Sequence, residues 1–211
     1  NADAPDGLTV LPPEEALERA RPLPSDDEMA IDGLTEAGRV VKDSVTDLAK
    51  ARVGIAVREG APTPDVSTPD AFRRAMLNAK TIACPDPALG GSSGVHIAKV
   101  FERLGISEMV KPKLVLVSTP GQPQTMPGHL VADGKAEIAL HQMQELISVP
   151  GVVIAGPLPG DLQETFVFSA AVMIDTDDVK AAKALIDYLR TPQAQAIIKA
   201  KGMEPAIPVK E

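Results

Sequence analysis

The amino-acid sequence predicts an α/β protein in which helices cover a mostly parallel sheet. Two observations support this class. Short β-branched runs alternate along the chain with stretches whose apolar residues recur at helical spacing, and glycine or proline separates them. The composition, 44% hydrophobic and 24% charged, is that of an ordinary globular protein. Because parallel strands need crossover connections, this alternation favours strand–helix–strand units.

The N-terminal elements are expected to be short. Residues 1–27 are rich in proline and acidic residues, with one short apolar run at 8–11 and a helical stretch at 14–21. A loop follows, and then a helix over about residues 28–37. Gly38 would close this helix, since glycine readily adopts the left-handed conformation of a helix C-terminus.

The middle of the chain carries the clearest local signals. Residues 52–58 alternate β-branched with other residues, which predicts a strand. Thr68, Pro69 and Asp70 form a helix start: a capping hydroxyl, a proline suited to the first turn and an acid that favours the positive helix end. The remaining expected strands are 81–84, 114–117, 136–140, 152–155 and 166–174, and the remaining expected helices are 95–104, 128–133, 178–189 and 191–202.

Composition and spacing argue against several function classes. The formal net charge of −8 and the 2% of aromatic residues disfavour nucleic acid as a partner. We expect no membrane insertion, because no apolar run reaches about 18 residues. The three histidines are far apart and the one cysteine has no pair, so we expect no metal and no cofactor. Cys84 reads as a small buried hydrophobe at a strand end.

The stretch Gly90–Gly94, Gly-Gly-Ser-Ser-Gly, precedes an expected helix. The first N–H groups of a helix have no internal partner, and the helix dipole adds partial positive charge there. Ser92 and Ser93 add hydroxyl donors. This pattern favours a site for an oxyanion or carboxylate, although a plain turn capped by serine would have the same sequence.

The same stretch also matches G-x-S-x-G, the nucleophile motif of serine hydrolases. Ser92 would be the nucleophile, and Asp133 and His141 follow in the required order. We disfavour this alternative because residues 85–89 separate the motif from the preceding strand, whereas the motif needs serine on the strand-to-helix turn. His96, one turn into the helix, could face a ligand, but we expect a surface histidine.

Four segments together resemble one known family. They are VGIAVREGAPTPDVSTPDAF at 53–72, PDPALGGSSG at 85–94, GKAEIA at 134–139, and TPQA at 191 leading to KGMEP at 201–205. In order and spacing they resemble the type II periplasmic solute-binding proteins of ABC importers, in the branch that includes the molybdate-binding proteins. The resemblance covers about residues 40–205.

The resemblance implies a fold of two lobes joined by two crossing strands. The first lobe would comprise residues 1–52 and 167–211, and the second lobe residues 53–166. A small oxyanion or carboxylate would be bound between the lobes without catalysis, so the chain is not expected to be an enzyme. The implied ligand-binding residues are Gly91, Ser92, Ser93 and Gly94, with Gln142 at a position where molybdate binders carry tyrosine. An ABC permease is the implied partner and the periplasm the implied location.

One departure from the family bears on assembly. The first strand–helix units of the first lobe have no counterpart here, so we expect that lobe to be incomplete and the chain to self-associate as a homo-oligomer. A degenerate relative with a structural or interaction role is an open alternative. A cytoplasmic location is the corresponding alternative if the gene is truncated.

Overall fold

The structure is a computed structural model that describes residues 31–117 and 126–206. The expected elements at 8–11 and 14–21 lie outside the described residues. The chain divides into a terminal unit (Asn1–Ala49, Val167–Ile197 and Pro205–Glu211) and a central unit (Lys50–Phe166 and Ile198–Glu204). The division into binding-protein lobes at residues 52/53 and 166/167 stays a prediction.

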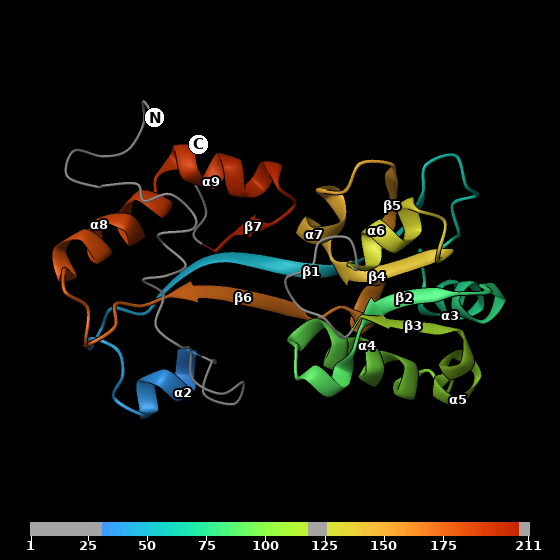
Figure 1. Cartoon of the computed structure of the whole chain (residues 1–211), viewed down its shortest axis with the longest axis horizontal. Coiled ribbons are helices and arrows are strands. Elements are labelled where there is room, and N and C mark those ends of the chain that lie inside the picture. Colours follow the sequence, from blue (N-terminus) through green and yellow to red (C-terminus); the bar gives the residue numbers. More distant parts are fainter. Residues whose placement is uncertain (1–30, 118–125, 207–211) are drawn as a thin grey trace. The chain divides into compact units, whose positions relative to one another are not determined.

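The sheet confirms the predicted α/β class (Figure 1). Its central strands are β1 (Thr46–Arg58), β2 (Ile82–Pro85), β3 (Leu114–Val117), β4 (Ile138–Gln142) and β5 (Val152–Pro157), in the order β3-β2-β4-β1-β5. Strand β2 is parallel to both β3 and β4, as expected. Strand β1 runs antiparallel to β4 and β5. The strands β6 (Thr165–Ala170) and β7 (Glu204–Pro205) also pair with β1.

Large apolar side chains fill one face of the central sheet. The helix α3 (Pro69–Asn78) supplies Phe72 and Met76 to this cluster, α4 (Ser92–Arg103) supplies Phe101, and α5 (Ser107–Val110) supplies Val110. The strands supply Ile55 and Leu140. The start of α3 confirms the sequence signal, because Thr68 Oγ1 accepts a hydrogen bond from the Ala71 amide at 3.1 Å and Pro69 opens the helix. The short helices η2 (Pro87–Leu89), η3 (Lys111–Lys113) and η5 (Gly160–Leu162) connect these elements.

Small side chains form the opposite face. Ala83, Ala139 and Ala56 lie in register across β2, β4 and β1, and all three are fully buried. The helices α6 (Pro127–Ala132) and α7 (Met143–Ile147) cover this alanine row with Val131 and Leu146. The α7 helix was not expected from the sequence. Since alanine is short, α6 can lie close to the strands.

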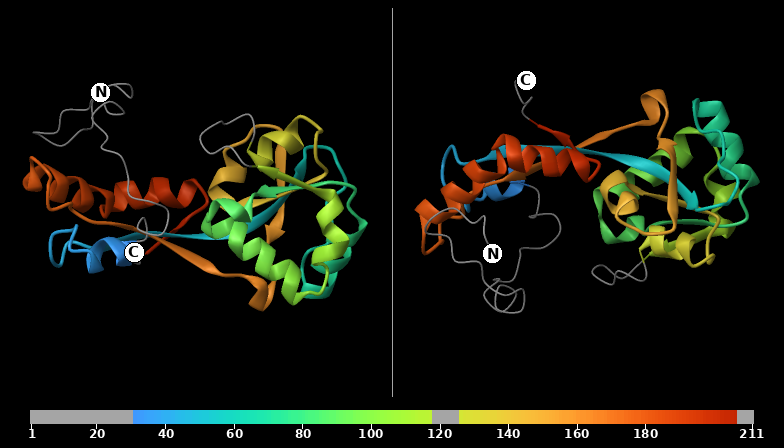
Figure 2. Two further views of the ribbon diagram at one scale, coloured as in Figure 1. Left: turned by 60° about the horizontal axis from the view of Figure 1, so that its bottom comes forward. Right: turned by 90° about the horizontal axis from the view of Figure 1, so that it is seen from above.

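The terminal unit contains α2 (Ile31–Glu36), α8 (Val179–Leu189) and the first six residues, 192–197, of α9 (Pro192–Ala200). Asp178 caps α8, since its Oδ1 accepts a hydrogen bond from Ala181 N at 2.8 Å. Figure 2 shows α8 and α9 in red, and α9 lies beside β1, where Gln195 donates to the Leu48 carbonyl.

Several large apolar side chains of the terminal unit are exposed. They include Val167, Phe168, Ile174, Leu185 and Ile197. Exposed apolar surface of this kind is the physical basis on which self-association was expected. A homo-oligomer stays a prediction.

Candidate functional site

The glycine–serine stretch runs from the turn after β2 into the first turn of α4. After β2 ends at Pro85, the η2 helix carries the chain to Gly90, which has a φ of 73°. Glycine adopts this left-handed conformation without steric cost. Gly91 then precedes the first residue of α4, Ser92. The short η2 segment confirms that Ser92 does not lie on a direct strand-to-helix turn.

The N-terminus of α4 presents a set of main-chain donors. Its first helical bond runs from the Val95 amide to the Gly91 carbonyl at 3.1 Å, so the amides of Ser92, Ser93 and Gly94 come before it. Gly91 has no side chain with which to cap them. Within the described residues, no hydrogen bond to these amides or to the two serine hydroxyls is found. Three N–H groups at the positive end of a 12-residue helix suit an anion.

Gly94 fixes where these donors lie. A Cβ at this position would be 3.0 Å from the Pro85 carbonyl oxygen and 3.3 Å from the Asp86 carbonyl carbon. A side chain at this position would therefore require the backbone of Pro85 and Asp86 to shift by a few tenths of an ångström relative to α4. These donors lie at the carboxyl end of the parallel strand β2, and α/β proteins commonly bind ligands at the carboxyl ends of their parallel strands.

His96 and Arg103 hold α4 against the segment 161–166. The Nε2 of His96 lies 2.9 Å from the Leu162 carbonyl oxygen, and its Nδ1 lies 2.8 Å from Glu164 Oε2. The His96 side chain is only 11% exposed, so the expectation of a surface histidine was wrong. Two turns further on, Arg103 donates to the Asp161 carbonyl at 2.8 Å and pairs with its carboxylate.

Gln142 lies at the same edge of the sheet as the glycine–serine turn. It is the last residue of β4 and precedes α7, and β4 is parallel to β2, so both strands end at one edge. Its side chain is half-buried, and its Oε1 accepts a hydrogen bond from Gln144 Nε2. The amide nitrogen of Gln142 remains a donor for a ligand. The roles of Gln142 and of residues 91–94 in binding stay predictions.

The structure does not assemble the hydrolase triad. His141 follows Leu140 on β4, and alternate strand residues face opposite sides, so His141 lies on the face of α6 and α7 rather than that of α4. The Asp133 carboxylate bonds to Lys135 Nζ at 2.9 Å. Among the described residues the buried Nδ1 of His141 has no hydrogen-bond partner. The imidazole is thus not oriented by an acid.

Two buried groups titrate far from their ordinary values. Burial lowers the pKa of His141 to about 4, which keeps the ring neutral at neutral pH. Burial, together with the nearby Asp86 charge, raises the pKa of the Cys84 thiol to about 12. Cys84 is a free, buried cysteine at the end of β2, which confirms the structural interpretation of this residue.

Two cavities of the central unit lie outside this region. One, of about 620 Å³, is lined by residues from the end of β1, the loop after it, α3 and the start of β4. The other, of about 680 Å³, lies between Pro64–Ser67 and the segment 155–165. Neither is lined by Ser92, Ser93 or Gln142. Sequence reasoning missed both cavities.

Within residues 31–117 and 126–206, no three histidine, cysteine, aspartate or glutamate side chains come together in a way that could hold a metal ion. The same residues contain no helix with the length and apolar character needed to cross a membrane.

The chain is similar to proteins named for their anions. It is 34% identical over 177 residues to an aconitate isomerase from a Pseudomonas species, covering 83% of this chain and 64% of that protein. It is 34% identical over 125 residues to a molybdate-binding protein of Azotobacter vinelandii, covering 58% of this chain and 46% of that protein. The chain thus spans less than two thirds of the length of these curated relatives.

A solved structure supports the same fold. A substrate-binding domain assigned to a molybdenum ABC transporter of Clostridium difficile superposes with a TM-score of 0.66 at 16% identity, covering 85% of this chain and 74% of that one.

The expectation that the chain is not an enzyme is contradicted by one relative, because the aconitate isomerase is an enzyme by name. The model of the bacterial extracellular solute-binding protein family matches residues 23–204, and the chain belongs to that family.

Proposed function

We propose that this chain binds a small anionic solute, an oxyanion or a carboxylate, at the N-terminus of α4. The observation that carries the proposal is the row of amides of Ser92, Ser93 and Gly94, which have no acceptor among the described residues. The hydroxyl of the exposed Ser92 adds a donor, whereas Ser93 is buried. Gln142 ends the neighbouring parallel strand at the same edge. The named relatives supply the ligand class, since aconitate and molybdate are both anions.

The proposed donors are main-chain amides, which most side-chain substitutions leave in place. Proline is the exception, because it has no amide hydrogen, and at Ser92 it can be compared directly with alanine. Ser92→Ala removes only the hydroxyl. Ser92→Pro removes the hydroxyl and the amide hydrogen, and proline is well tolerated at the first position of a helix. Gly91 has φ −60° and ψ 130°, the extended conformation that a residue before proline prefers.

The test is calorimetric titration with molybdate, sulfate, cis-aconitate and citrate. A hydrogen bond to a charged group contributes about 1.5–3 kcal/mol. We therefore expect Ser92→Pro to weaken binding about tenfold or more and Ser92→Ala by less. Ser107→Ala, at the first residue of α5, is the matched control and should bind like the wild type. Equal affinities for wild type and Ser92→Pro would refute the proposed site.

A second candidate function is isomerisation of a small carboxylate. The similarity to an aconitate isomerase over 83% of this chain favours it. The assay is conversion between cis- and trans-aconitate, followed by chromatography at catalytic protein concentration. Turnover that Ser92→Pro reduces would place the reaction at the α4 site. Binding without turnover in the wild type would leave solute capture as the function.

We further propose that the protein acts in the periplasm and delivers its solute to an ABC permease. The family description, bacterial extracellular solute-binding protein, supports an exported location. Fractionation of cells that express the chain from its own gene would test the location. Co-purification with a membrane permease would test the partnership.

A further inference from the structure

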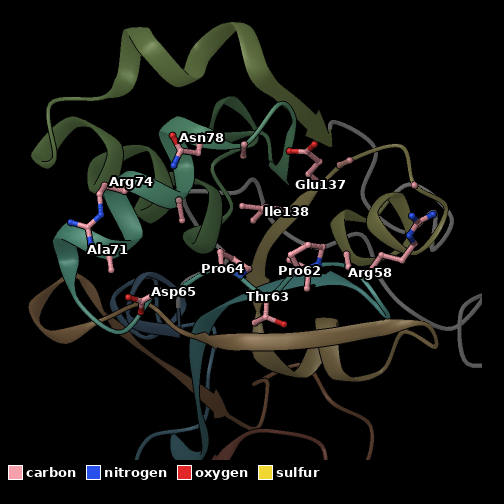
Figure 3. A pocket seen from close by; sticks show the side chains of 16 residues that line it. Arg58, Pro62, Thr63, Pro64, Asp65, Ala71, Arg74, Asn78, Glu137 and Ile138 are labelled. Carbon is pink, nitrogen blue, oxygen red and sulfur yellow. The ribbon is translucent and has the colours of Figure 1, made fainter.

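The 620 Å³ cavity of the central unit has the size of a small-molecule site (Figure 3). It lies at the sheet edge opposite to Gln142, because it is lined by the first residues of β4 and the last residues of β1. It shares no residue with the site proposed at α4. A ligand here would therefore be independent of the anion bound by α4.

The cavity has a mainly apolar lining. The loop after β1, the helix α3 and the start of β4 supply most of its aliphatic part, which includes Ala61, Pro62, Pro64, Ala75, Ala79 and Ile138. Proline and alanine lose little or no side-chain entropy when a ligand covers them. Such a lining suits a short hydrocarbon chain.

Arg58 supplies the charge. Figure 3 shows Arg58 and Arg74 on opposite sides of the cavity. The Nη1 of Arg58 lies 3.1 Å from the position where Gly134 would carry a Cβ, and Gly134 has a φ of 73°. Glycine at this position thus leaves room for the guanidinium. Within the described part of the chain, no hydrogen bond or ion pair to Arg58 is found.

The two carboxylates of the cavity, Asp65 and Glu137, are engaged in hydrogen bonds, and Asp65 also offsets part of the charge of Arg74. Asp65 Oδ1 accepts hydrogen bonds from the Ser67 amide at 3.0 Å and from the Ser67 hydroxyl at 2.7 Å. These bonds and, to a smaller extent, the charge of Arg74 lower the pKa of Asp65, so Asp65 partly offsets Arg74. Glu137 Oε2 accepts from the Lys80 amide at 2.7 Å. Arg58 is therefore the group best placed to meet an added anion.

We propose that this cavity binds a short aliphatic carboxylate, with the carboxylate on Arg58 and the hydrocarbon chain on the proline, alanine and isoleucine surface. A guanidinium binds a carboxylate in a fork of two parallel hydrogen bonds. The hydrocarbon chain then extends toward Arg74, because Pro62, Pro64 and Ile138 lie between the two arginines in Figure 3.

The test is calorimetric titration of the full chain with linear monocarboxylates from butanoate to octanoate. We expect the affinity to rise about fourfold for each added methylene until the cavity is full. Arg58→Gln should lower the affinity at least tenfold, and Arg58→Lys should lower it less. Ala75→Phe should block the chain without changing the charge. Arg190→Gln, an exposed arginine outside the cavity, is the control.

Circular dichroism and melting temperature would show that each variant is folded. Ser92→Pro should bind the monocarboxylates like the wild type, which separates this cavity from the α4 site. Absence of saturable heat in the wild type, affinity independent of chain length, or unchanged binding by folded Arg58→Gln and Ala75→Phe would each overturn the proposal.

Discussion

The stability of the central unit is expected to depend on pH through His141. This residue is 9% exposed, lies on the alanine face of β4 and has a buried Nδ1 without a hydrogen-bond partner among the described residues. Its pKa is about 4 in the folded protein, against an ordinary value of 6.5. The unfolded chain therefore takes up a proton before the folded chain does. The stabilising contribution is complete above pH 6.5 and is lost as the pH falls toward 4.

The magnitude follows from the two pKa values. A difference of about 2.5 units corresponds to about 3 kcal/mol when the loss is complete, at about 1.4 kcal/mol per unit. At pH 4.5 most of it, about 2.5 kcal/mol, is already lost. This is a large share of the 5–15 kcal/mol typical of a folded protein. The shifted carboxylates Asp65 and Asp133 have pKa values lowered below 3.8, so they lose their charge mainly below this window.

The assay is urea unfolding at pH 7.5 and pH 4.5, for the wild type and for His141→Leu. Leucine has a similar volume and does not titrate, and the variant keeps every other titratable group. We expect the wild type to lose about 2.5 kcal/mol more than the variant between the two pH values. Equal losses would refute the reasoning, because they would mean that His141 is hydrated or protonated in the folded protein.

Three further outcomes are expected. The buried Cys84 thiol, with a pKa raised to about 12, should resist iodoacetamide at pH 8 until urea is added, as intact mass would show; rapid native labelling would contradict its burial. Gly94→Val should destabilise the protein by about 1–3 kcal/mol. Gly91→Val, with nothing within 4 Å of the added Cβ, should change the free energy of unfolding by no more than about 0.5 kcal/mol. Equal melting temperatures for the two variants would argue against the close contact at Gly94. His96→Phe should cost about 1–3 kcal/mol by leaving acceptors without a donor, and an unchanged thermal unfolding curve would show that His96 does not hold α4.

Local signals in the sequence predicted some helix starts well. Thr68 caps α3 as the flanking residues indicated, since a cap depends on three or four consecutive residues. The helix α8 begins at Val179, next to the expected start at residue 178, whereas α4 begins at Ser92 rather than at the expected residue 95. Strand ends were predicted less well. Strand β1 begins at Thr46 rather than near Arg52, because its first half gains order from pairing with other strands. The five-residue helix α7 gave no periodic pattern, since it buries only Leu146.

Part of the candidate site could be predicted from the sequence and part could not. The donors at Ser92 and Ser93 were predictable because glycines, serines and the following helix are contiguous. The partners of His96 were not, since Leu162 and Glu164 lie more than sixty positions away in the sequence. The cavity at Arg58 was missed for the same reason: its lining comes from three separate segments, and only tertiary folding brings them together.

One face of the central sheet carries large apolar side chains and the other carries alanines, so the two faces should differ in how many substitutions they tolerate. Over the bulky face, exchanges among isoleucine, leucine and valine can be absorbed by repacking. On the face covered by α6 and α7, Ala56, Ala83 and Ala139 are fully buried, so an added methyl group would have to displace the covering helices. In a deep mutational scan, successive positions of β4 should therefore alternate between tolerating and not tolerating larger apolar side chains. That alternation would show, from survival data alone, which face of the sheet each side chain occupies.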